Sequence, residues 1–291
     1  MKTFLRKIYE ALPFKLPVYN VMRKFISLPQ KAYAYFYFTG DFKTKLEDKS
    51  FWMRNYGYQY HVENELFWGG IEKGWEKESV TLWVKLSKIH NNVLDIGANT
   101  GLFSVITKTI NPNAKVIAFE PMPKIFEKLK YNVELNKLDV QMTTLALSDY
   151  DGKATIYPTN LEHVYSVTVN QKRDDIKVPV HEVKIKTIRL DHYIEQNNIQ
   201  NVDLIKIDVE THEPQVLDGM GIYLKKFKPT FLIEIQSDEI ANKIEKLTEG
   251  CGYQYYNIDE NGGITKVDKL TKSSYFNFLM CSKEVASKIG L

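Results

Sequence analysis

The chain contains 291 residues, of which 44% are apolar and 26% are charged, and its formal net charge is +3. These values are typical of a soluble globular protein and exclude the disordered, collagen-like and coiled-coil classes. The two cysteines, Cys251 and Cys281, are too few for a disulfide framework or a four-ligand zinc site. No run of about 18 apolar residues occurs, so we expect no transmembrane helix and a cytoplasmic protein.

The positive charge is concentrated in the first 31 residues, which hold seven basic residues and one acidic residue, whereas the remainder is slightly acidic. Pro13, Pro17 and Pro29 are expected to divide this arm into two short amphipathic helices. Two interpretations stay open. The arm either makes a peripheral contact with an anionic membrane surface, here the inner face of the cell membrane, or packs on its own domain or a partner. No signal-peptide pattern is present.

Residues 1–89 are predicted to form the basic arm and an aromatic-rich extension. Short strands are expected on either side of the turn-like residues 39–41, which read Thr-Gly-Asp. A helix is predicted from about Trp75 to Ile89 because Leu82, Leu86 and Ile89 share one face.

Residues 90–291 are predicted to form a doubly wound α/β domain with a parallel sheet. The near-continuous apolar runs that indicate strands are 93–96, 116–119, 140–145, 204–207 and 231–235. Helices are predicted over 123–136 and 238–249. A β insertion is expected at about 151–187, with strands near 153–157, 165–169 and 177–186. Near the C-terminus, residues 253–258 and 264–267 indicate a hairpin, and 275–281 a further strand.

The strongest functional signal is the segment 93–104, VLDIGANTGLFS. It predicts a strand that ends at Asp95, a tight turn with Gly97 and Gly101, and the start of a helix. The glycine spacing matches neither the dinucleotide fingerprint nor a P-loop. An acid inside the turn suits a cationic or amino-bearing group better than a pyrophosphate.

A second acid, Glu120, ends the next predicted strand. A carboxylate at this place can accept hydrogen bonds from both hydroxyls of a ribose. The alternative is a buried structural acid, but such a group would need a partner of its own.

These segments resemble the FkbM family of S-adenosylmethionine-dependent methyltransferases. The resemblance covers about residues 90–240, in the blocks DIGANTGLFS (95–104), FEPMPKIFEKLKYNVELN (119–136), ALSDYDG (146–152), LDHYIEQNNIQNVDLIKIDVE (190–210) and EPQVLDG (213–219). It implies a seven-stranded Rossmann-like sheet whose last strands form a hairpin. It also implies O-methylation, often of sugar hydroxyls in glycans, glycolipids and natural products. In this resemblance Asp95, Gly97, Asn99 and Gly101 would contact the methionine portion of the cofactor, Glu120 the ribose, and Ala146, Leu147 and Ser148 the adenine.

Ionisable residues gather after the fourth and fifth core strands. They are Lys206, Asp208, Glu210, His212 and Glu234. A hydroxyl acceptor needs a base to remove its proton, and Asp208 and His212 are our preferred candidates, with Glu210 and Glu234 as orienting groups. Alternatively, Asp208 only supports the methionine end of the cofactor and Lys206 makes a structural ion pair. The carboxylates could also bind Mg²⁺, although we do not expect a metal.

One residue departs from the family pattern, which usually reads D-V-E-G-x-E at this point. Thr211 replaces the glycine. If the glycine has a positive φ, a threonine in its place is strained and the loop carrying His212 changes shape.

Acceptor binding is assigned to Glu65 and Trp68 in the extension and to Tyr165 and Ser166 in the insertion, although such aromatic residues are more often part of a core.

The Asn-Pro-Pro-Tyr and Asp-Pro-Pro-Tyr motifs of many amino-group methyltransferases are absent, which favours oxygen as the acceptor. The acidic body also argues against a nucleic-acid partner. Two alternatives remain at this point: a Rossmann-like dehydrogenase or glycosyltransferase-related enzyme that uses another nucleotide, and a non-catalytic cofactor-binding subunit. The sequence indicates neither the acceptor nor the oligomeric state.

Overall fold

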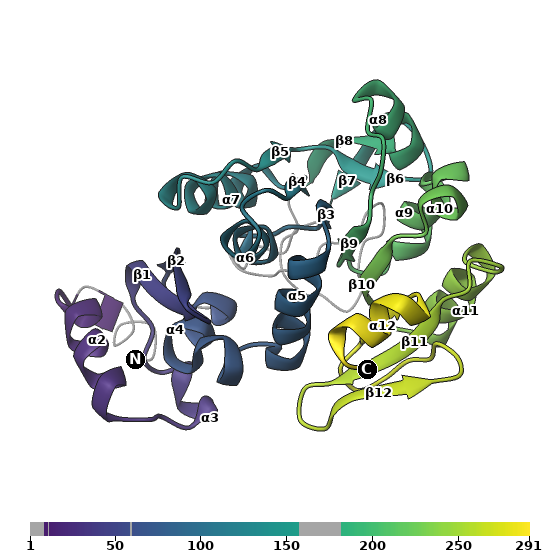
Figure 1. Cartoon of the computed structure of the whole chain (residues 1–291). Helices are drawn as coiled ribbons and strands as arrows, with labels where there is room; N and C mark the ends of the chain where they lie inside the picture. Colours follow the sequence, from purple (N-terminus) through teal and green to yellow (C-terminus); the bar gives the residue numbers. More distant parts are fainter. Residues whose placement is uncertain (1–8, 11, 59, 157–181) are drawn as a thin grey trace. The chain divides into compact units, whose positions relative to one another are not determined.

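The computed structural model describes residues 9–10, 12–58, 60–156 and 182–291. The chain divides into two compact units, Met1–Lys77 and Glu78–Leu291 (Figure 1). The helix predicted near residues 75–89 therefore belongs almost entirely to the second unit, whereas the sequence analysis grouped it with the N-terminal extension.

In its described residues, the first unit combines a β-hairpin with helices α2 to α4. The hairpin strands are β1 (Thr39–Leu46) and β2 (Lys49–Tyr56), and the helices are α2 (Lys15–Phe25), α3 (Gln30–Tyr33) and α4 (His61–Lys73). The core is aromatic: the ring of Phe67 on α4 lies 4.5 Å from that of Phe38 and 5.5 Å from that of Phe42. Aromatic rings bury a large apolar area, so a small unit can form a core from few residues.

Two local predictions for this unit were wrong. Thr39-Gly40-Asp41 is not a turn, because these residues begin β1 and pair with β2. The chain reverses at Glu47, whose φ is 55°, and Asp48. A strand forms here because buried and exposed side chains alternate along β1: Phe42, Thr44 and Leu46 are buried and the residues between them are exposed. Pro17 does not end a helix but lies in the first turn of α2, where its missing N–H costs nothing. Most of the other helix predicted in the arm lies outside the described residues.

The second unit contains a sheet of eight strands in the order β12-β11-β13-β10-β9-β3-β4-β5. The strands are β3 (Asn92–Ile96), β4 (Lys115–Phe119), β5 (Gln141–Thr143), β9 (Leu204–Ile207), β10 (Thr230–Glu234), β11 (Gln254–Asp259), β12 (Gly263–Val267) and β13 (Asn277–Cys281). The five strands from β5 to β10 run parallel, and β13 runs antiparallel to β10 and β11.

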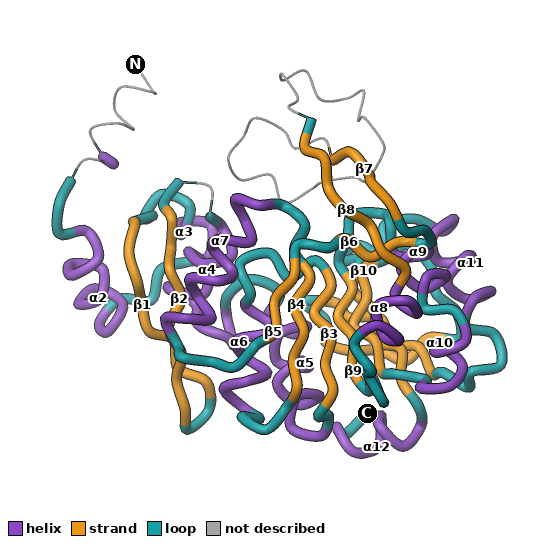
Figure 2. The backbone as a smooth tube through the Cα atoms, turned by 90° about the horizontal axis from the view of Figure 1, so that it is seen from above, coloured by secondary structure: helices purple, strands orange, loops and turns teal. Residues whose placement is uncertain are grey.

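Helices cover both faces of this sheet (Figure 2). They are α5 (Lys77–Ile89), α6 (Leu102–Ile110), α7 (Pro123–Leu135), α8 (Leu190–Gln196), α9 (Glu213–Gly219), α10 (Ile222–Phe227), α11 (Asp238–Leu247) and α12 (Lys283–Ile289). Leu94 and Ile96 point into the cluster formed with α8, α9 and α11. Because successive side chains of a strand face opposite ways, Asp95 points to the other face, where its carboxylate contacts α6.

The predicted fold class is confirmed: the structure is a doubly wound α/β sheet with the predicted core strands and the predicted helices at 123–135 and 238–247. The number of strands differs from seven because β12 pairs with β11 and extends the edge of the sheet. The single strand expected over 140–145 is instead β5 followed by β6 (Ala146–Ser148), which joins a separate small sheet.

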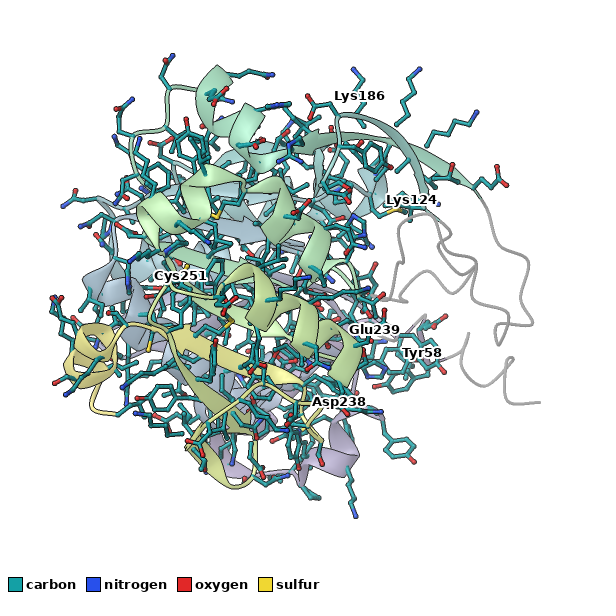
Figure 3. All side chains as sticks on the ribbon, turned by 90° about the vertical axis from the view of Figure 1, so that its right-hand side faces the viewer. Tyr58, Lys124, Lys186, Asp238, Glu239 and Cys251 are labelled. Atoms are coloured by element: carbon teal, nitrogen blue, oxygen red, sulfur yellow. The ribbon has the colours of Figure 1, made fainter. Side chains whose placement is uncertain are left out.

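The β insertion is described only in part. β7 (Gly152–Ile156) pairs antiparallel with β8 (Val183–Arg189), and β8 pairs parallel with β6. Lys186, on β8, points away from the protein in Figure 3. Residues 157–181 lie outside the described residues, and with them the acceptor candidates Tyr165 and Ser166 and the strand predicted at 165–169.

The predicted helix near residue 75 begins two residues later, at Lys77. The carboxylate of Glu260, in the β11–β12 loop, accepts hydrogen bonds from the backbone N–H groups of Glu78 (2.7 Å) and Ser79 (3.2 Å). These groups have no partner within the helix, so a carboxylate at this end stabilises its start. Among the described residues, no helix is both long and apolar enough to cross a bilayer.

Candidate functional site

Asp95 ends the central strand β3 and holds the start of α6. Its Oδ2 accepts hydrogen bonds from the backbone N–H of Ser104 (3.0 Å) and from the Ser104 hydroxyl (2.6 Å). The side chain is fully buried, and burial raises its pKa. The positive charge of Lys206 on the neighbouring strand acts the other way and lowers it. Asp95 therefore fixes the loop between β3 and α6.

Glu120 links that loop to the end of β4. One carboxylate oxygen accepts the backbone N–H of Asn99 and the other that of Met122, both at 2.9 Å. Burial raises the pKa of Glu120 to about 7. Each carboxylate oxygen can accept more than one hydrogen bond, so Glu120 keeps acceptor capacity for a ligand's hydroxyl groups.

Gly97 allows the loop to lie against the end of β9. A Cβ on Gly97 would lie 1.9 Å from the carbonyl oxygen of Asp208, and the residue has a φ of 76°. Only glycine combines this backbone conformation with so close an approach. The two acidic loop segments are therefore in direct backbone contact, as expected for the carboxyl ends of neighbouring parallel strands.

Lys206 and Asp208 form an ion pair with 3.0 Å between Nζ and Oδ2. The Lys206 side chain is only 7% exposed and its ammonium lies 4.7 Å from the centre of the Phe103 ring, whereas the Asp208 side chain is 34% exposed. Of this pair it is the Asp208 carboxylate that is accessible to a substrate. The predicted proximity of Lys206 and Asp208 is thus observed.

Glu210 and Glu234 are connected through a residue that the sequence analysis missed. The side-chain amide of Gln236 donates hydrogen bonds to Glu210 (2.9 Å) and Glu234 (2.8 Å). Burial, together with the charges of Asp208 and Glu210, raises the pKa of Glu234 to about 9. The raised pKa favours the protonated form of Glu234, which can donate a hydrogen bond.

Gln236 is held where β10 gives way to α11. Ser237 caps that helix by accepting the backbone N–H of Ile240. Asp238 and Glu239 lie in its first turn, where negative charge suits the helix dipole.

The segment from Asp208 to α9 has an unusual backbone. Glu210 and Thr211 have φ values of 54° and 78°, in the left-handed region. The loop is held by Glu213, whose Oε1 accepts the backbone N–H groups of Val209 and Thr211, both at 3.2 Å. Glu213 is fully buried and its pKa is raised to about 8 by burial. Thr211 thus has the positive φ that the sequence analysis named as the condition for strain at this position.

His212 contacts β6. Its Nε2 lies 3.0 Å from the Ser148 hydroxyl, which in turn donates to Asp149 at 3.0 Å. A hydroxyl that gives its proton to Asp149 accepts from Nε2, so this nitrogen carries the proton. Burial lowers the pKa of His212, which favours the neutral ring. His212 is thereby committed to a hydrogen bond with Ser148 and joins the segment 146–148 to the start of α9.

Two of the residues predicted to bind the acceptor, Trp68 and Glu65, lie on α4 in the first unit. The indole of Trp68 donates to the carbonyl of Phe36 at 2.9 Å and lies among aromatic rings, with the Phe67 ring at 4.9 Å and the Tyr19 ring at 5.2 Å. Glu65 accepts a hydrogen bond from Gln30 at 2.8 Å. It also lines a shallow pocket of about 280 Å³ with Lys31, Tyr33 and Asn64. Their role in acceptor binding stays a prediction.

Two buried oxygens at the loop suit a ligand rich in hydrogen-bond donors. Within the described residues, Oδ1 of Asp95 and Oδ1 of Asn99 have no hydrogen-bond partner. Unsatisfied buried acceptors are uncommon and call for an explanation. An ammonium group and ribose hydroxyls would supply donors of the right kind. Across the described ranges, no group of three His, Cys, Asp or Glu side chains is arranged to hold a metal ion.

Known proteins match this part of the chain. The Methyltransferase FkbM domain matches residues 95–255, more than half of the chain. Methyltransferase sdnD of Sordaria araneosa is 27% identical over 188 residues, which cover 55% of this chain and 73% of sdnD. Hexuronic acid methyltransferase AglP of Haloferax volcanii is 26% identical over 172 residues, covering 59% of this chain and 67% of AglP. 2-O-methyltransferase NoeI of Sinorhizobium fredii is 26% identical over 141 residues, covering 44% of this chain and 56% of NoeI.

The matched region begins at Asp95 and includes Glu120, the β9–α9 segment and Glu234. The acids at the ends of β3, β4 and β9 and the glycine contact between them thus lie within the shared domain. The chain belongs to the FkbM family of methyltransferases.

Proposed function

We propose that the protein transfers a methyl group from S-adenosylmethionine to a hydroxyl of a sugar-containing acceptor. The observation that carries this proposal is the set of acids at the carboxyl ends of three adjacent parallel strands: Asp95 on β3, Glu120 on β4 and Asp208 after β9. Ligands of doubly wound folds bind at such strand ends. Two relatives with sugar-related or O-methyl names, AglP and NoeI, support oxygen as the acceptor atom.

The cofactor supplies an electrophilic methyl group on a sulfonium centre. Glu120 would accept hydrogen bonds from the ribose hydroxyls, and Asn99 and Asp95 offer the unpaired oxygens of the loop to the methionine end. Segment 146–148 would line the adenine, with His212 fixing Ser148 in place. These residues bind and orient, which is the main contribution an enzyme makes to a displacement of this kind.

The proton of the acceptor hydroxyl would go to Asp208. Its carboxylate is the accessible member of the pair with Lys206, which holds it in position at 3.0 Å. Glu234, whose raised pKa favours the protonated form, would donate a hydrogen bond to a neighbouring sugar oxygen. His212 is a weaker candidate for the base because its Nε2 already bonds to Ser148. General bases of this kind contribute roughly 10²- to 10⁴-fold to a rate.

Isothermal titration with S-adenosylmethionine tests the binding step. Glu120→Ala should abolish binding, whereas Glu239→Ala, an exposed carboxylate on α11, should leave it unchanged. No binding to folded wild-type protein would overturn the proposal. A thermal shift with NAD or a nucleotide sugar, and none with S-adenosylhomocysteine, would favour the other nucleotide-using enzymes considered above.

Catalysis is tested separately with a panel of sugar acceptors. Asp208→Asn should lower kcat at least about 100-fold while cofactor binding persists. A wild-type protein that binds the cofactor but methylates no acceptor would instead support a non-catalytic binding subunit. An Asp208→Asn variant with wild-type kcat would exclude Asp208 as the base.

A further inference from the structure

Helix α2 is anchored to its own unit by one face. Tyr19 is buried, with its ring 5.2 Å from that of Trp68. Arg23 donates hydrogen bonds to the carbonyls of Phe67 (3.1 Å) and Lys43 (3.2 Å), and its guanidinium lies 4.2 Å from the centre of the Phe67 ring. The orientation of the helix about its axis is therefore fixed.

The opposite face of α2 is apolar and exposed. Phe14, just before the helix, Val18, Val21 and Phe25 follow one another at helical spacing and are 75%, 51%, 57% and 82% exposed. We call these four residues the apolar stripe. A helix on a protein surface normally turns its polar side to water and its apolar side to the core. Here the outer side is the apolar one, which marks a surface for interaction.

The charge around the stripe is mostly positive, and the one acidic residue of the first 31, Glu10, interacts electrostatically with Lys15 at the start of α2. Residues 12–40 contain no aspartate or glutamate, and their four basic residues are Lys15, Arg23, Lys24 and Lys31. Lys24 and Lys31 are exposed. At about 1.5 Å per residue the 11-residue helix is roughly 16 Å long, which suits lying in a membrane interface and not crossing it.

We propose that the apolar stripe of α2 inserts into the surface of an anionic lipid bilayer, with Lys24 and Lys31 at the level of the lipid headgroups. Apolar side chains that enter the headgroup region supply hydrophobic binding, and lysines beside them add electrostatic attraction to acidic lipids. A protein partner or a second copy of the chain would bury the stripe equally well. The excess of basic residues in the first 31, seven against one acidic residue, favours the anionic lipid surface.

Vesicle sedimentation with the full chain tests this proposal. We expect the wild-type protein to sediment with vesicles of phosphatidylcholine and phosphatidylglycerol at 3:1, and much less with pure phosphatidylcholine. Raising the salt concentration should weaken binding. Phe25→Ser should weaken it roughly tenfold or more, because a phenylalanine side chain loses its apolar burial. Lys24→Gln should weaken it about fivefold, the fold-change that corresponds to one basic residue at an anionic surface.

The matched control is Ile222→Ser, which removes another exposed apolar side chain (73% exposed) from the second unit. It should bind vesicles as the wild type does. Failure of the wild type to bind anionic vesicles, or equal binding by Phe25→Ser, would overturn the proposal. Light scattering identifies the competing occupant: if the wild type is a dimer that Phe25→Ser dissociates, and neither binds vesicles, the stripe is a subunit interface and the lipid proposal is wrong.

Discussion

Replacing Thr211 by glycine should stabilise the protein. Thr211 has a φ of 78°, which a β-branched residue adopts only under strain. Such strain costs about 1–3 kcal/mol. Its backbone N–H, which donates to Glu213, is retained in the variant.

The magnitude follows from two opposing effects. Relief of strain contributes about 1–3 kcal/mol, and the greater freedom of glycine in the unfolded chain removes about 0.4–1 kcal/mol. The free energy of unfolding should therefore rise by about 1 kcal/mol. For a domain of this size that corresponds to an increase in Tm of roughly 2–4 °C.

Urea unfolding at pH 7, followed by circular dichroism, measures this change. The midpoint should move to higher urea with an unchanged m value. Thr211→Ala serves as the matched control, because alanine loses the same side chain but keeps a Cβ in the left-handed region. If Thr211→Gly is no more stable than the wild type, or if Thr211→Ala gains as much, strain at this position is not the reason.

Three further predictions concern the same site. Gly97→Ala should destabilise the fold by about 3 kcal/mol in urea unfolding, since its Cβ would collide with the carbonyl of Asp208 and its φ is positive. Burial raises the pKa of Glu234 from 4.5 to about 9, so the native state binds the extra proton and stability should fall as pH rises from about 5 to about 9. Glu234→Gln should flatten that slope when the free energy of unfolding is compared at pH 6 and pH 9; an equally steep slope would argue against Glu234 as its source. Ser148→Ala should cost about 1–2 kcal/mol of stability, because the buried His212 Nε2 loses its partner.

The core of the fold could be predicted because its strands are apolar on both sides. Leu204–Ile207 is buried at every position, so its sequence alone indicates a covered parallel strand. The sequence of helix α4 shows no comparable apolar pattern. It buries Glu63 and Asn64, and Asn64 donates to the carbonyl of Tyr33 and accepts from Asn55. Such polar burial depends on partners elsewhere in the chain, which periodicity does not reveal.

Some residues of the candidate site could likewise be predicted from the sequence, and others could not. Asp95, Glu120 and Asp208 could be predicted because each lies at the carboxyl end of a strand, and strand order brings them together. Gln236 could not, because its role depends on the simultaneous reach of its amide to Glu210 and Glu234. The contact of His212 with Ser148 joins residues 64 positions apart and was likewise hidden. The strain at Thr211 was the exception, since a missing glycine in the family pattern is visible in the sequence.

The order of strands in the large sheet bears on how the protein is made. β13 lies between β10 and β11, although it follows both in the chain. Until residues 277–281 leave the ribosome, β10, a largely buried and apolar strand, and β11, a partly buried one, each expose an unpaired edge. Such edges are prone to pairing with other chains. We therefore expect the nascent protein to depend on chaperones until β13 is inserted between β10 and β11.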